Sequence, residues 1–175
     1  MSEAPGELQQ YAALVDKVDA FWRAAVERQP EAFRCREACA SCCHQQLSVR
    51  PVEAAAIRAH LRGLPADRRR ALAPRAGATH DACVFLRDDR CAIYPVRPLI
   101  CRTHGLAIRV EGRVDHCPLN FEGVDPRPEG ILDLEQINTL LMLVDRLFLE
   151  GRSAPPDTPR VELSELADAL ETATG

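Results

Sequence analysis

Cys35-Arg-Glu-Ala-Cys39-Ala-Ser-Cys42-Cys43 is the stretch of this chain that decides its organisation. It holds four of the eight cysteines. The other four are spread along the segment that follows, at Cys83, Cys91, Cys101 and Cys117. Thiols gathered in this way, in a chain that lacks an export signal, typically hold metal. The sequence therefore indicates a metal-binding module.

The compartment decides between metal and disulfides. The segment Met1–Gln10 contains acidic residues and no apolar core, so it does not resemble a secretory signal. The longest apolar run, residues 140–144, is ended by Asp145 and Arg146, well short of the roughly 20 residues that a membrane span needs. We expect a cytoplasmic chain with reduced thiols and no membrane partner. A disulfide scaffold is the less favoured alternative, because a chain of this length can bury about 70% of its unfolded surface without such links.

Charge restricts the partners. The formal net charge is −4, with 22 basic and 26 acidic residues. No basic field favours nucleic acid, so none is expected as a partner. A protein partner is left open, without identification. Lys17 is the only lysine, and its expected place on a surface helix argues against lysine-based covalent chemistry.

The predicted fold is mainly α with small β-hairpins, forming a compact, metal-stabilised cysteine-cluster domain. Apolar periodicity and breakers predict helices over residues 7–28, 51–61, 65–73 and 133–151, and hairpins over 83–94 and 106–115. One domain is expected over residues 1–151, with the motif core at 33–118. Residues 152–175 are predicted to form a proline-rich linker and a short amphipathic helix that packs loosely or binds something.

The late helix has the strongest pattern. Asp133 with Gln136 resembles a capping box, and Gly151 supplies a stop. One apolar face, expected to be core, is formed by Leu134, Ile137, Leu140, Leu141, Val144, Leu147 and Phe148.

The spacing of the first four cysteines has a geometric meaning. If the segment is helical, Cys35, Cys39 and Cys42 fall within about 60° of one another, and Cys43 lies about 100° round from Cys42. Two adjacent cysteines fit one tetrahedral ion poorly, so the doublet indicates two neighbouring sites or one polynuclear site. Eight thiolates match two four-cysteine sites in number, whether zinc ions or iron–sulfur clusters.

Other polar residues are weighed against simpler roles. His44, His104 and His116 adjoin or lie near cysteines and are candidates to orient a ligand, whereas His60 and His80 are expected at the surface. Arg97 and Arg102 are predicted to bind the cofactor by donating to cysteine sulfurs and offsetting thiolate charge. The alternative is that both arginines cap carbonyls of the small hairpin. Tyr94 is expected to pack in the core.

The combined pattern resembles a known family. Cys35-x3-Cys39-x2-Cys42-Cys43, Cys83-Val-Phe-Leu86, Cys91-Ala-Ile-Tyr94 and Arg97-Pro98-x2-Cys101-Arg102 are similar to the YkgJ-like cysteine-cluster family of zinc- or iron-chelating domains. The resemblance covers residues 33–118 and implies that all eight cysteines are metal ligands. Members carry labels such as iron–sulfur oxidoreductase, ferredoxin-like protein and flagellin N-methylase.

Two classes of function follow from this resemblance and from the cysteine pattern. The first is a metal-chelating protein, with an iron–sulfur cluster preferred over zinc and redox activity as one use of the metal. The second is a metal-dependent enzyme, an oxidoreductase or N-methylase-like protein, with an open metal position. An adaptor whose C-terminal tail docks elsewhere is a third reading. Whether the chain is an enzyme is left open, and no catalytic residue is assigned.

Overall fold

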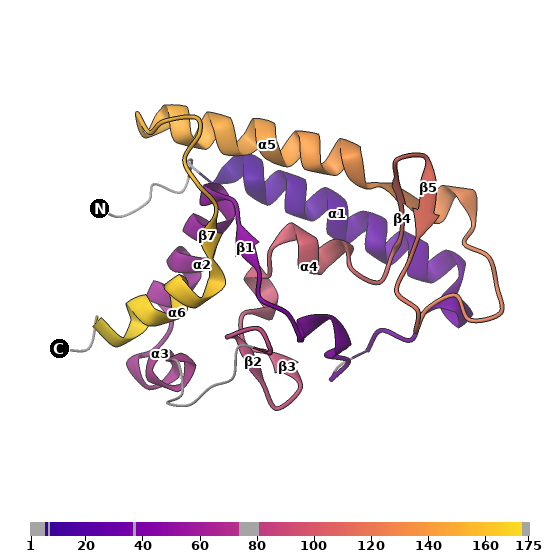
Figure 1. The fold of residues 1–175 in the computed structure, drawn as a ribbon, viewed down its shortest axis with the longest axis horizontal. Coiled ribbons are helices and arrows are strands. Elements are labelled where there is room, and N and C mark those ends of the chain that lie inside the picture. The colour runs from indigo at the N-terminus through magenta and orange to yellow at the C-terminus, as the bar shows by residue number, and fades with distance from the viewer. Residues whose placement is uncertain (1–5, 7, 37, 74–80, 173–175) are drawn as a thin grey trace.

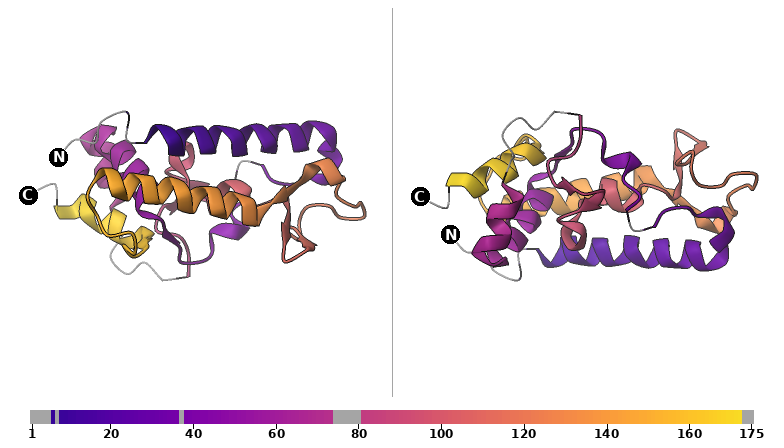
Figure 2. Two further views of the ribbon diagram at one scale, coloured as in Figure 1. Left: turned by 90° about the horizontal axis from the view of Figure 1, so that it is seen from above. Right: turned by 90° about the horizontal axis from the view of Figure 1, so that it is seen from below.

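The structure is a computed structural model that describes residues 6, 8–36, 38–73 and 81–172. Two long helices, α1 (Gln9–Arg28) and α5 (Leu134–Gly151), lie side by side along its long axis (Figures 1 and 2). The short helix α4 (Leu99–Thr103) packs against α1. Helices α2 (Pro51–Gly63), α3 (Ala66–Leu72) and α6 (Leu163–Thr172) gather at one end of the molecule (Figure 1). The predicted class, mainly α with small strand pairs in a compact fold, is confirmed.

The strands are short and form three separate sheets within the described residues. Strands β2 (Leu86–Arg87) and β3 (Arg90–Cys91) pair antiparallel, as do β4 (Ala107–Val110) and β5 (Arg113–Asp115). Both are hairpins that the sequence predicted, although the first has arms of only two residues. Strand β6 (Ile131–Asp133) adds to β4 in parallel. Strand β1 (Ser48–Val49) pairs antiparallel with β7 (Val161–Glu162).

The first hairpin is tight because its turn uses left-handed backbone. Asp88 and Asp89 have φ of 48° and 58°, which two-residue hairpin turns of this kind require and which aspartate tolerates better than most residues. The turn fixes the register that pairs Leu86 with Cys91. Hairpin geometry therefore sets where Cys91 lies.

Two acidic side chains hold the beginning of α2. The Glu53 carboxylate accepts a hydrogen bond from the backbone N–H of Arg50 (2.9 Å), and Asp145 accepts one from the N–H of Val52 (2.9 Å). These bonds satisfy helix donors that would otherwise be unpaired. Asp145, which interrupts the apolar run of the late helix, is thus a buried contact between α5 and α2.

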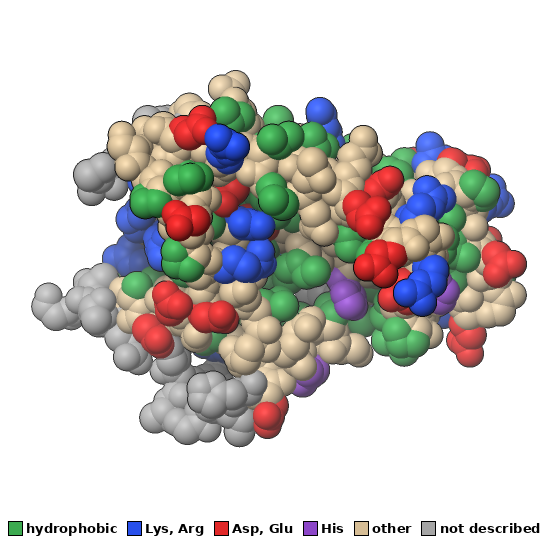
Figure 3. All heavy atoms as spheres, turned by 45° about the horizontal axis from the view of Figure 1, so that its top comes forward, with side chains coloured by type: hydrophobic (Ala, Val, Ile, Leu, Met, Phe, Trp, Pro, Cys, Tyr) green, Lys and Arg blue, Asp and Glu red, His purple; other side chains and the backbone are tan. Residues whose placement is uncertain are grey.

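Helix α5 begins as predicted, since Asp133 accepts a hydrogen bond from the N–H of Gln136 (2.9 Å). Its predicted apolar face is partly wrong. Leu140 and Leu147 are 39% and 51% exposed, together with Met142 and Leu143, and hydrophobic side chains are visible on the surface where this side comes forward (Figure 3). The buried side of α5 is made by Leu141, Asp145, Phe148 and Leu149. The helix is rotated from the expected orientation, which places Asp145 against the beginning of α2.

The C-terminal segment is an integral part of the core, which corrects the expectation that it packs loosely or binds something. Strand β7 closes on β1, and the apolar face of α6 is buried. That face packs in one cluster with Ile57 of α2 and Phe85. The buried residues of the segment are Leu163, Leu166, Ala167 and Leu170.

Among the described residues, no helix is long and apolar enough to cross a membrane. The remaining short elements are 3₁₀ turns at Pro30–Ala32, Ser41–Cys43, Tyr94–Val96 and Pro128–Gly130.

Candidate metal centre

The first four cysteines lie on irregular backbone, not on the helix that the spacing argument considered. The described part of residues 34–40 has no helix, and only a 3₁₀ turn spans Ser41–Cys43. Two local turns, Cys39 N–H to Arg36 O (3.0 Å) and Cys43 N–H to Ala40 O (2.8 Å), shape the segment. On this loop the four thiols can point in different directions, whereas on a helix Cys35, Cys39 and Cys42 would share one face.

Four cysteines from separate elements converge around the first hairpin; we call them the hairpin group (Cys43, Cys83, Cys91 and Cys101). The N–H of Cys83 donates to the carbonyl of Cys43 (2.7 Å), which ties the loop to the start of the hairpin. The hairpin brings Cys91 back, and α4 carries Cys101. Negative charge on Cys83 and Cys91 raises the pKa of both Cys43 and Cys101, so these thiols lie within electrostatic reach of one another.

Three further cysteines lie within electrostatic reach of one of their number, Cys35, which contacts Asn120; we call them the Asn120 group (Cys35, Cys39 and Cys117). The Asn120 side chain donates to the Cys35 sulfur (3.4 Å), and its backbone N–H donates to the Cys117 carbonyl (2.9 Å). Burial raises the pKa of Cys35, and negative charge on Cys39 and Cys117 raises it further. Asn120 therefore links residues 35 and 117 across the fold.

Cys42 lies between the two groups. A negative charge on Cys42 raises the pKa of Cys35 on one side and those of Cys83, Cys91 and Cys101 on the other. Its own pKa is lowered to about 6, because the neighbouring Cys43 thiol donates to it and His104 adds positive charge nearby. The same contact raises the pKa of Cys43. Among the cysteines whose pKa is shifted, Cys42 is thus the one that loses its proton most easily.

The thiols suit a soft metal ion by their chemistry. Burial raises the pKa of Cys83 and Cys91, and that of Cys101 to about 12, so these thiols give up their protons only to a compensating cation. All eight cysteines are free of disulfides and half-buried. Among the described side chains, no three metal-binding groups meet at ligand distance.

The histidines differ in exposure and in their distance from the cysteines. His104 and His44 are exposed, and His104 acts on Cys42. His116 is half-buried, with Nδ1 3.1 Å from the Cys117 carbonyl and its ring against Phe121. His60 is half-buried and lines a cavity, so the expected surface position is only partly correct. His80 lies outside the described residues.

The two arginines occupy different positions. Arg102 is buried, and its guanidinium donates to Asp19 (2.6 Å) and to the carbonyls of Arg97 (2.9 Å) and Pro95 (2.7 Å). Arg102 thus caps carbonyls, as in the alternative reading, but these carbonyls follow the hairpin and do not belong to it. Arg97 stacks on the exposed ring of Tyr94 (3.8 Å), and its positive charge offsets part of the rise that burial causes in the pKa of Cys91. The exposure of Tyr94 corrects the expected core position.

Asn120 is a site residue that sequence reasoning missed. It is 1% exposed, and its amide also donates to the Gly105 carbonyl (2.6 Å) and accepts from the Arg34 N–H (2.8 Å). Gly105 allows this approach: its φ is +94°, and a Cβ there would lie 2.7 Å from the Cys35 sulfur. The only sequence signal is an amide three residues after Cys117.

Replacing Asn120 with alanine is expected to weaken metal binding about tenfold, the lower end of the usual effect of losing a residue that orients a ligand. The change removes the donor to Cys35 and leaves Arg34 N–H and Gly105 O unpaired. Zinc affinity measured by competition with a chromophoric chelator provides the test. The exposed Asn138→Ala is the control and is expected to bind like the unaltered chain. An Asn120→Ala affinity equal to that of the control contradicts the assigned role.

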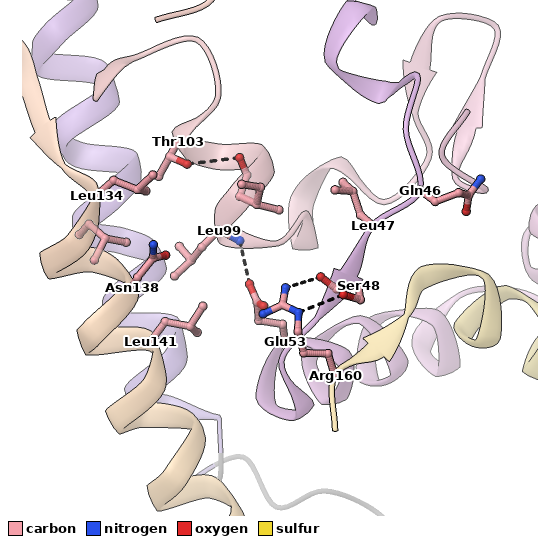
Figure 4. A pocket seen from close by; sticks show the side chains of 12 residues that line it. Gln46, Leu47, Ser48, Glu53, Leu99, Thr103, Leu134, Asn138, Leu141 and Arg160 are labelled. Carbon is pink, nitrogen blue, oxygen red and sulfur yellow. Dashed lines mark hydrogen bonds between the residues drawn. The ribbon is translucent and has the colours of Figure 1, made fainter. Parts of the chain in front are cut away.

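Glu53 is the second missed residue, because it positions α4. Its other oxygen accepts from the N–H of Leu99 (2.9 Å), so one buried carboxylate caps α2 and holds the start of the helix that carries Cys101 (Figure 4). A cavity of about 290 Å³ adjoins this link, between α4, α5 and β1. Arg160 spans its edge to Ser48 (Figure 4).

Replacing Glu53 with alanine is expected to lower the free energy of unfolding by about 3 kcal/mol, because two buried N–H groups lose their acceptor and a void remains. Urea unfolding followed by circular dichroism measures the loss. Glu122→Ala, at an exposed position, is the control and should change stability by less than about 0.5 kcal/mol. A similarly small change for Glu53→Ala would show that the carboxylate does not hold α4.

We compared the chain with known protein families, curated proteins and solved structures. Residues 34–118 match the model of the CxxCxxCC family, described as "Putative zinc- or iron-chelating domain". No curated protein and no solved structure matches the chain. The matched segment begins one residue before Cys35, ends one residue after Cys117, and so contains all eight cysteines. Residues 34–118, just under half of the chain, are therefore similar to a family described as a zinc- or iron-chelating domain.

Proposed function

We propose that this protein holds two metal centres, each bound by four thiols. One set is the hairpin group of Cys43, Cys83, Cys91 and Cys101. The other joins Cys42 to the Asn120 group of Cys35, Cys39 and Cys117. The observation that carries the proposal is the position of the Cys42–Cys43 doublet between the two groups. Cys43 is tied to Cys83 by a backbone hydrogen bond (2.7 Å), and Cys42 acts electrostatically on Cys35 as well as on the hairpin group.

Iron–sulfur clusters are the preferred occupants, with zinc as the alternative. Both take four thiolates, and the family description allows zinc or iron. The mixed spacing with a doublet is less typical of zinc sites than paired C-x2-C motifs. When bound, such a cluster would supply one-electron chemistry. The chain itself supplies hydrogen bonding from Asn120 to Cys35 and the positive charge of Arg97 near Cys91, which favour the thiolate forms.

Metal analysis with a visible absorption spectrum tests this function, on protein purified anaerobically without chelators. Iron with acid-labile sulfide and a broad absorption band supports clusters. Colourless protein with two zinc ions per chain supports the same two sites with the alternative metal, and the redox role is then dropped. Protein that binds neither metal after anaerobic reconstitution would overturn the proposal.

A second candidate is an enzyme with an open metal position, and Cys42 is the observation that favours it. Its pKa of about 6 makes it a thiolate at neutral pH in the metal-free chain, and a thiolate is the reactive form. Alkylation of the metal-loaded protein by iodoacetamide, read by mass spectrometry, separates the two functions. Closed sites protect all eight thiols, whereas an open position leaves one that is modified rapidly.

A further inference from the structure

A second cavity lies against α1 and α2, and none of the described cysteines lines it. Its volume is about 400 Å³, and its walls come from α1, α2, α4 and the turn at Pro95 and Val96. This size is within the usual range of small-molecule sites. Its lining is mostly apolar, with Val15, Ala56 and Val96 among the residues that form it.

One polar group in this cavity lacks a partner. Tyr11 is 5% exposed, and no described residue forms a hydrogen bond with its hydroxyl. The hydroxyl oxygen is not among the fully buried atoms that lack a partner, so it is open to the cavity although the rest of the side chain is buried. Burial raises the pKa of Tyr11 above its ordinary value, so the hydroxyl keeps its proton and remains a donor. The cavity therefore offers a hydrogen bond that no described residue uses.

The charges around the cavity disfavour an ionised ligand. Arg102 lines it, and its positive charge disfavours an amine. Asp16 also lines it and would repel a carboxylate, and Arg102 is already paired with Asp19 (2.6 Å). An uncharged molecule meets neither penalty.

We propose that this cavity binds an uncharged small molecule with an apolar body and one hydrogen-bond-accepting oxygen, such as a carbonyl, held by the Tyr11 hydroxyl. The site goes beyond metal chelation and does not depend on it. It lies close to the centre nonetheless, because Cys101 precedes Arg102 on α4 and its charge acts on Tyr11.

The test uses 1-tetralone, an unreactive ketone, and tetralin, the same ring system without the oxygen. The chain has two tyrosines, so protein labelled with 3-fluorotyrosine gives two fluorine NMR signals, which Tyr94→Phe assigns. We expect 1-tetralone at millimolar concentration to shift the Tyr11 signal and to leave that of Tyr94, which is 59% exposed, unchanged.

Tyr11→Phe separates the hydrogen bond from apolar packing. In a ligand-observed NMR titration, this variant should bind 1-tetralone about fivefold more weakly, the loss expected for one hydrogen bond. Its affinity for tetralin should stay within about twofold. Its melting temperature should not fall, because the removed hydroxyl has no protein partner. Ala56→Leu, which adds bulk to the wall, should weaken both ligands.

Three results would overturn the proposal: no shift of the Tyr11 signal with 1-tetralone, equal affinity of Tyr11→Phe and the unaltered chain for 1-tetralone, or unimpaired binding by Ala56→Leu. Metal content is measured in the same samples and should be unchanged by Tyr11→Phe. Failure of this site is therefore distinguishable from failure of the metal centres.

Discussion

Leu166→Asp is expected to unfold the whole domain. Leu166 is 1% exposed and packs in the cluster that contains Ile57 of α2 and Phe85 of the hairpin segment. The change removes a buried leucine and places an unpaired carboxylate in its position, at a cost of about 5 kcal/mol or more. Domains of this kind have a free energy of unfolding of about 5–15 kcal/mol. Urea unfolding followed by circular dichroism should show a midpoint near zero denaturant.

Asp168→Ala is the matched control, because Asp168 lies two residues away on the exposed side of the same helix. It should change the free energy of unfolding by less than about 0.5 kcal/mol. Deletion of residues 152–175 should resemble Leu166→Asp, since it removes both β7 and α6. A deleted chain that unfolds at the original midpoint would restore the view of this segment as a loose tail.

Cys42→Ser has the second largest expected effect, because Cys42 lies between both groups of thiols. Its loss removes one ligand from the Asn120 set and the neighbouring charge from the hairpin group. We expect metal content per chain to fall by at least half. The melting temperature of the metal-loaded protein should fall with it, since binding energy at structural sites contributes directly to folding. Elemental analysis and differential scanning calorimetry provide the two measurements.

Ser41→Ala is the control for this change, since the neighbouring side chain is exposed and offers no thiol. It should retain full metal loading. A Cys42→Ser protein with unaltered metal content and melting temperature would remove Cys42 from the ligand set and with it the proposed role of the doublet.

Local sequence signals predicted much of the secondary structure. The Asp133 cap, Pro51 at the start of α2 and the two hairpins appear as expected, because each depends on a few neighbouring residues. The orientation of α5 was not predictable in this way. Leucines occur on two sides of this helix. Which side is buried depends on the distant contact between Asp145 and Val52.

The metal centre likewise depends on distant contacts that local sequence signals do not predict. The eight cysteines are evident from spacing, but their division into groups depends on backbone contacts between Cys43 and Cys83 and on the buried amide of Asn120. The helical geometry assumed for the first motif pointed to three thiols on one face, whereas the irregular loop distributes them. Glu53 was missed because an acid in the first turn of a helix is usually no more than a cap.

The most direct test of the two-centre account is the metal stoichiometry of Cys101→Ser and Cys117→Ser, each reconstituted anaerobically beside the unaltered chain. Cys101 belongs only to the hairpin group and Cys117 only to the Asn120 group. Each variant is predicted to lose one centre and keep the other, so that each retains about half of the metal. Loss of all metal in either variant, or full retention in both, would contradict the division of the eight thiols into two four-thiol centres.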